Sequence, residues 1–136
     1  MGVPSTVRAA GWAALLSGAP STLHALATGR DPFEATVAAG SILLPGETRR
    51  PRLLAAGVPV HVALSLGWAL ALDRAGVRGT RRGALAGLAI GVVDLSLAAR
   101  VLPRIRALPL VPQLADHVAY GAVAGHVLAR ARAGRG

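Results

Sequence analysis

Three residues whose side chains carry protons or ligands stand close together near the C-terminal end of the chain. Asp116, His117 and Tyr120 begin an apolar stretch of membrane-crossing length, and Gly121 and Gly125 follow at a four-residue spacing. At about 100° per residue, these three side chains and Gly121 occupy one sector of about 140° on a helix. Ionisable groups are costly in hydrocarbon, so we expect this sector to face other helices and not lipid.

Further ionisable residues interrupt the other apolar stretches of the sequence. His24, His61 and Asp94 each lie inside one of them. Counted inward from the expected helix ends at 1.5 Å per residue, these three lie about 6 to 13 Å below one membrane face, and Asp116 and His117 about 5 Å below it. We therefore expect one intramembrane polar cluster, made by residues of four helices.

Such a cluster is compatible with three classes of function. Asp94 and Asp116 paired with His61 and His117 would change protonation in the physiological range, as in a proton-responsive or small-solute transport component. Histidines of different helices would also bind a metal or haem, through His24, His61 and His117, although no metal-binding motif or cofactor signature is present. The third class, which we expect here, is a structural or accessory membrane protein. No nucleophile and base are arranged as in an enzyme, so we expect no catalytic activity.

The same residues also have structural interpretations. The helix macrodipole favours an acid in the first turn, which would make Asp116 a capping or anchoring group. The histidines would donate hydrogen bonds to neighbouring helices. Asp94 directly follows a run of spaced glycines, and we expect it to pair with His61 or His117. Two acids near expected helix ends are interpreted as solvated charges: Asp73 and Glu47.

The composition indicates a membrane protein. Of 136 residues, 53% are hydrophobic and 17 are glycine, yet there are only two Trp, one Tyr and one Phe. Closely packed membrane helices use small residues in this way, whereas a soluble core of this size normally has more aromatics. The absence of cysteine excludes disulfides and thiolate metal sites.

The elements that must position these residues are helices. We expect one all-α membrane domain over residues 1–136, a transmembrane bundle. Pro20 should kink the first span, and the pair Asp31–Pro32 should start a short helix whose rise of ~20 Å is less than the ~30 Å hydrocarbon core. That helix is expected to be re-entrant or interfacial. The expected spans cover about 7–28, 53–73, 83–99 and 113–130, and the short helix about 32–44.

Spaced glycines predict how the helices pack. Gly83, Gly87 and Gly91 are in register at four-residue intervals, and Gly121 and Gly125 repeat the spacing on the last span. Glycine at this spacing lets two helix backbones approach closely. We therefore expect both glycine sets to be helix-packing surfaces.

Charge suggests the partners and the location. All fifteen basic residues are Arg, and the net charge is +9. The arginines separate the apolar stretches and do not line one face, so we expect anionic lipid headgroups as partners and not nucleic acid. We expect a multi-pass protein of the plasma membrane, with a second copy or another membrane protein as partner, and arginine counts slightly favour cytoplasmic termini. The last span should end in an arginine-rich tail: Arg130, Arg132 and Arg135.

Three segments carry a resemblance to known proteins. They are 17–24 (SGAPSTLH), 31–40 (DPFEATVAAG) and 112–121 (PQLADHVAYG). The chain resembles a family of small uncharacterised actinobacterial multi-span membrane proteins. The last segment, continued to Gly125, is also faintly similar to a bacterial inner-membrane family linked to acid resistance. Both resemblances imply a helical membrane protein, and neither assigns a catalytic residue.

Overall fold

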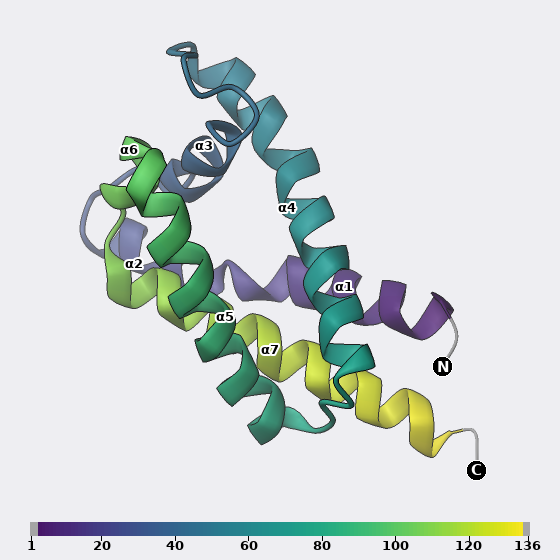
Figure 1. The fold of residues 1–136 in the computed structure, drawn as a ribbon. Helices are drawn as coiled ribbons and strands as arrows, with labels where there is room; N and C mark the ends of the chain where they lie inside the picture. The colour runs from purple at the N-terminus through teal and green to yellow at the C-terminus, as the bar shows by residue number, and fades with distance from the viewer. Residues whose placement is uncertain (1–2, 135–136) are drawn as a thin grey trace.

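The fold of residues 3–134, the part of the chain that this computed structural model describes, consists of helices (Figure 1). The predicted all-α class is confirmed for these residues. Arg135, predicted to belong to the arginine-rich tail, lies outside them. The helices are α1 (Val3–Ser17), α2 (Ala19–Ala27), α3 (Glu34–Gly40), α4 (Arg50–Arg74), α5 (Thr80–Val101), α6 (Pro103–Arg106) and α7 (Leu110–Ala133).

The first predicted span is broken and not merely kinked. One helix was expected over 7–28, but the chain forms α1 and α2 with Gly18 between them. Pro20 has no N–H and its ring clashes with the preceding turn, so it favours the first turn of a new helix. It stands there, in the first turn of α2. Just after α2, Gly29 adopts a positive φ of +69°, and the helical path of the chain ends there.

The short helix is about half as long as predicted. Instead of 32–44, α3 covers Glu34–Gly40. Asp31 is not its cap, because the Asp31 Oδ1 atom accepts a hydrogen bond from the Phe33 N–H at 2.9 Å, before the helix begins. At the other end Ser41 turns the chain, since both its N–H (3.1 Å) and its hydroxyl (2.6 Å) donate to the Ala38 carbonyl. Seven residues rise only about 10 Å, too little to cross a bilayer.

The other three predicted spans correspond to α4, α5 and α7, each longer than expected. α7 begins at Leu110, three residues before the predicted start. Pro112 is thus inside the first turn, which tolerates proline because the N–H groups there have no partner within the helix. As a result Asp116 lies in the second turn of α7, and its predicted place in the first turn is wrong.

Close backbone contact through glycine joins α5 to α7, which form the most extensive helix pair. A Cβ atom added to Gly121 would lie 2.7 Å from the Gly87 Cα, and one added to Gly125 would lie 3.0 Å from the Gly83 Cα. The Gly79 N–H donates to the Gly125 carbonyl at 2.9 Å, where the chain enters α5. The two glycine sets singled out in the sequence therefore lie against each other.

A second close pair joins α3 to α4. A Cβ atom on Gly40 would lie 2.9 Å from the Leu53 Cα, and Gly57 lies against the carbonyl of Thr36. α3 is held in this way along the first two turns of α4. The short helix is therefore fixed in place although it is only two turns long.

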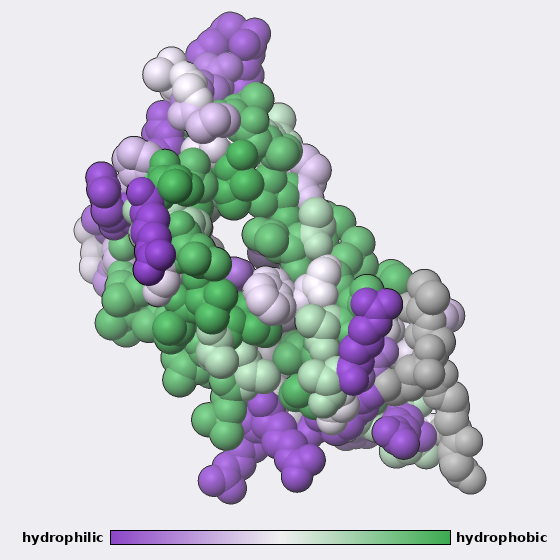
Figure 2. All heavy atoms as spheres, viewed as in Figure 1, coloured by the Kyte–Doolittle hydropathy of each residue, from purple (hydrophilic) through white to green (hydrophobic). Residues whose placement is uncertain are grey.

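The helices α4 and α5 diverge from the turn that connects them (Figure 1). α4 packs mainly on α3 and α1, whereas α5 packs on α7 and α6. Figure 2 shows an opening between them. The small core lies below it, where α1 and α7 meet the end of α4 and the middle of α5: Ala9, Ala13, Leu72, Ile90, Tyr120, Ala124 and Leu128.

Much of the apolar surface is exposed. Among residues 3–134, α4 and α5 are the two helices long and apolar enough to cross a membrane, and only 33% and 17% of their most apolar 18-residue windows are buried. Figure 2 shows hydrophobic side chains over the middle of the visible face and hydrophilic ones at its extremities. Two apolar helices are thus available for a membrane.

Candidate functional site

The Asp94 side chain of α5 contacts residues of two other helices, α4 and α7. Its Oδ2 atom accepts a hydrogen bond from the Trp68 Nε1–H of α4 at 2.9 Å. The same oxygen lies 3.8 Å from Nε2 of His117 on α7. The side chains of His117 and Asp94 are 24% and 28% exposed, so the pair is partly shielded. The structure therefore brings Asp94 and His117 together and bridges the diverging helices α4 and α5.

The other ring nitrogen of His117 fixes where a proton must be. Nδ1 lies 2.8 Å from the carbonyl oxygen of Gln113, one turn earlier on α7. A carbonyl only accepts hydrogen bonds, so Nδ1 carries the hydrogen. In a neutral imidazole Nε2 would then present a lone pair toward the Asp94 oxygen. A proton on either Nε2 or the carboxyl group would remove this repulsion.

Glycine provides the space in which this pair forms. A Cβ atom on Gly91 would lie 2.8 Å from the His117 Cβ and 2.9 Å from its Cγ. Gly91 stands three residues before Asp94, on the same face of α5. The imidazole can therefore approach the carboxylate only because position 91 has no side chain.

Asp116 and His61 act at the break between α1 and α2. Oδ1 of Asp116 accepts a hydrogen bond from the Ser21 N–H at 2.8 Å, in the first turn of α2. Nε2 of His61 lies 3.1 Å from the carbonyl of Ala14, in the last turn of α1. Polar groups at helix ends lack partners within the helix. Asp116 therefore caps a neighbouring helix and not its own.

The remaining two candidates are Tyr120 and His24. The Tyr120 hydroxyl donates to the backbone carbonyl of Ser65, which ties α7 to α4. The His24 side chain is partly buried and, within residues 3–134, forms no hydrogen bond or ion pair. The predicted cluster is thus two neighbouring contacts, one around Asp94 and one at the helix break.

A separate ionic contact closes the other end of the bundle. Asp73 was expected to be a solvated charge, but its side chain is only 8% exposed and pairs with Arg78 at 2.7 Å. It also accepts a hydrogen bond from the Thr6 hydroxyl at 2.7 Å. Since the carboxylate joins α1 to the loop after α4, the expectation of a solvated charge is wrong. His126 is exposed nearby on α7, with Nδ1 3.4 Å from the Thr80 hydroxyl.

Sequence patterns did not identify Trp68, Ser21 or Gln113. Trp68 contributes its one N–H donor, whereas Ser21 and Gln113 act through backbone atoms that every sequence has. For Ser21 the one indication in the sequence was Pro20 beside it, because a proline interrupts the backbone hydrogen bonds of a helix and leaves nearby backbone groups in need of other partners.

The histidines do not converge on one centre. The described residues contain no group of three His, Asp or Glu side chains that could hold a metal ion. His61 and His117 lie instead against two different backbone carbonyls. Metal or haem binding through the histidines therefore has no geometric support among these residues.

The chemistry available to this site is an electrostatic contact between a carboxyl group and an imidazole, together with hydrogen bonds to backbone groups at the break between α1 and α2. Both depend on residues of different helices, so the site exists only when the bundle is assembled. In comparisons with family models, curated proteins and solved structures, the chain has no match.

Proposed function

We propose that the chain is a multi-pass protein of the plasma membrane whose four spans are α1 with α2, α4, α5 and α7. The exposed apolar surface of α4 and α5 supports this, because a helix in a soluble core would bury most of its most apolar segment. α7 has 24 residues, a rise of about 36 Å, which exceeds the hydrocarbon thickness. The short helices α3 and α6 would lie along one membrane face. Cytoplasmic termini and the resemblance to actinobacterial membrane proteins remain predictions.

This topology predicts that the two ends of the α3 segment lie on the same side of the membrane. Cysteines placed at Gly29 and Thr48 of this cysteine-free chain should both react with an impermeant thiol reagent added to one side of oriented vesicles. A control cysteine at Ala75, one span away, should react only from the other side. Reaction of positions 29 and 48 from opposite sides would mean that the α3 segment crosses the bilayer, contrary to the proposal.

Within this bundle we infer a proton-responsive element formed by Asp94, His117 and Trp68. The observation that carries it is the hydrogen bond from His117 Nδ1 to a carbonyl, because it turns Nε2 toward the carboxyl group. A histidine changes charge between about pH 5 and 8 in ordinary surroundings. Gain or loss of that proton would strengthen or weaken the contact between α5 and α7 and so bias the opening beside α4.

A structural or accessory role is the second candidate, and the helix break favours it. Asp116 and His61 each satisfy one backbone group freed between α1 and α2. Polar side chains in such places hold helices in register without any change of protonation. A partner, either a second copy or another membrane protein, would then use the exposed apolar faces.

Trp68 provides the measurement that separates the two candidates. With Trp12 replaced by Phe, the fluorescence of the detergent-purified protein reports on the indole that donates to Asp94. We expect its emission to change between about pH 5 and 8, since a charge within the reach of the indole changes there. The change should disappear in Asp94→Asn and in His117→Gln.

His126→Gln is the matched control, because it removes an exposed histidine from the same helix at a distance from Trp68. Its emission should titrate like that of the parent. If the parent emission is constant over this range, or if His126→Gln abolishes the change as His117→Gln does, the proton-responsive proposal fails and the structural role stands.

A further inference from the structure

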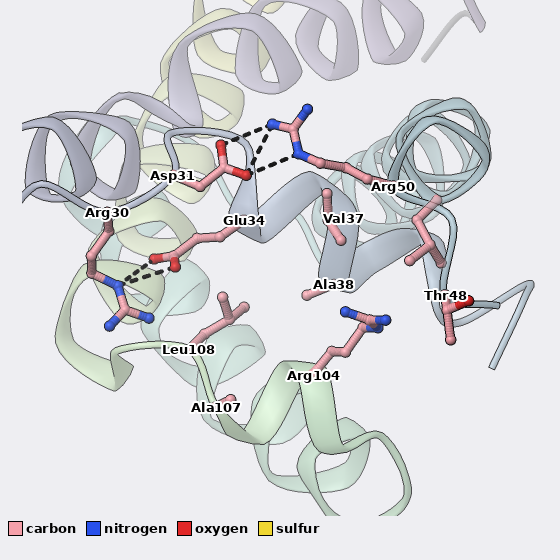
Figure 3. Close-up of a pocket in the computed structure, with 11 residues that line it drawn as sticks. Arg30, Asp31, Glu34, Val37, Ala38, Thr48, Arg50, Arg104, Ala107 and Leu108 are labelled. Atoms are coloured by element: carbon pink, nitrogen blue, oxygen red, sulfur yellow. Dashed lines mark hydrogen bonds and ion pairs between the residues drawn. The ribbon is translucent and has the colours of Figure 1, made fainter. Parts of the chain in front are cut away.

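A cavity of about 340 Å³ lies between α3, the start of α4 and α6 (Figure 3). Its size is in the range of small-molecule sites in proteins. Apolar side chains line its inner part: Val37, Ala38, Leu53 and Leu108. Charged side chains surround its mouth: Arg30, Asp31, Glu34, Arg50 and Arg104. An apolar interior with a charged rim fits an amphiphilic ligand.

Two of the three arginines at the rim are already neutralised. Arg30 pairs with Glu34 at 2.9 Å, and Arg50 pairs with Asp31 at 2.9 Å. Hydrogen bonds from the Phe33 N–H and from Arg50 hold the pKa of Asp31 below its ordinary value, so this acid is charged at neutral pH. These four side chains add no net charge to the rim.

Arg104 supplies the charge that is left over. Within residues 3–134 its side chain has no carboxylate at ion-pair distance, and its one hydrogen bond is a long one of 3.3 Å to the Glu47 carbonyl. Figure 3 shows its guanidinium group reaching from α6 into the cavity, toward Ala38 and Thr48. The rim therefore presents one uncompensated positive charge, with the Thr48 side chain beside it.

We propose that this cavity binds the phosphodiester group of a membrane phospholipid, with Arg104 as the principal ligand and the apolar interior against the start of an acyl chain. A phosphodiester carries a single negative charge, which matches the single uncompensated arginine, and guanidinium groups bind phosphate oxygens through paired N–H donors. The site rests on the proposed membrane function, because it places α3 and α6 at the level of the headgroups. A soluble phosphodiester has the same charge but no chain for the apolar interior.

Lipid retention measured by native mass spectrometry tests the site. Detergent-purified protein would be titrated with phosphatidylglycerol, and we expect one tightly bound lipid per chain. Arg104→Gln should weaken that binding about tenfold, the effect of losing one charge-assisted contact. Arg100→Gln removes the same charge from the end of α5, outside the cavity, and should bind within about twofold of the parent.

Two further arms define the ligand and protect the test against misfolding. Ala107 is exposed at the mouth of the cavity, so Ala107→Phe should fill it without disturbing the core and should also weaken lipid binding. Glycerophosphoglycerol, the headgroup without acyl chains, should not displace the lipid at equal concentration. Equal losses in Arg104→Gln and Arg100→Gln, or displacement by the free headgroup, would overturn the proposed lipid site. The cysteine-labelling result is independent of these outcomes, so failure of the lipid site and failure of the membrane topology are distinguishable.

Discussion

Replacing Gly87 with leucine should separate α5 from α7 and destabilise the whole bundle. A Cβ atom at this position would lie 3.1 Å from the Gly121 Cα and closer still to the backbone carbonyl of His117. Backbone cannot move aside as the end of a flexible side chain can, so the two helices would have to part. We expect a loss of at least about 2 kcal/mol in the free energy of unfolding, the upper part of the usual range for an overfilled core.

The chain itself offers the control for this substitution. Gly67 on α4 and Gly11 on α1 have nothing within 4 Å of an added Cβ atom. Gly67→Leu and Gly11→Leu make the same chemical change and gain the same helix propensity, so they should be neutral or slightly stabilising. Thermal aggregation of the detergent-purified variants measures the difference. Melting of Gly87→Leu within a degree or two of the parent would show that the α5–α7 contact does not hold the bundle.

The helix pairing was predictable because it depends on a local, repeated pattern. Gly83, Gly87 and Gly91 stand one helical turn apart. A helix face without side chains lets another backbone approach closely, whatever the position of that helix in the fold. The sequence could not say which helix would fill that surface. Gly121 and Gly125 carried the same pattern, and the structure pairs the two sets.

The polar contacts were less predictable, because their partners are set by tertiary structure. The break at Gly18 exposes backbone groups whose hydrogen-bond partners come from α7 and α4, about 95 and 47 residues away. Asp116 was expected to cap its own helix, because the start of α7 was placed too late. An error of three residues in a helix boundary thus changed the role assigned to one acid. The second acid, Asp73, was misjudged because its arginine partner lies beyond a turn.

The packing surface and the polar site are parts of one structure. Gly91 continues the glycine series of α5, and its missing side chain is what admits the His117 ring. Asp94 follows three residues later and meets both His117 and Trp68. A change in the separation of α5 and α7 would therefore alter the distance between carboxyl and imidazole. Conversely, a change in the charge of either group would act directly on the contact between α5 and α7.

Asp94 and His117 should be energetically coupled, whereas Asp94 and His61 should not. The Asp94 carboxyl lies 3.8 Å from His117, while His61 lies against the Ala14 carbonyl on another helix. Removing one member of a shielded charge pair leaves the other without compensation. Each substitution should therefore lower the free energy of unfolding more when it is made alone than when the other member has already been replaced. We expect a coupling free energy of about 1 kcal/mol for Asp94→Asn with His117→Gln.

Two double-mutant cycles measured side by side provide the test. The melting of Asp94→Asn, His117→Gln, His61→Gln and the two double variants would be compared from pH 5 to 8. The His61 cycle is the matched control, since it makes the same change to a histidine on a helix that also contacts the site. Its effects should add within about 0.5 kcal/mol. Additive effects in the His117 cycle at every pH would mean that Asp94 is held by Trp68 alone, and the inferred proton-responsive pair would have to be abandoned.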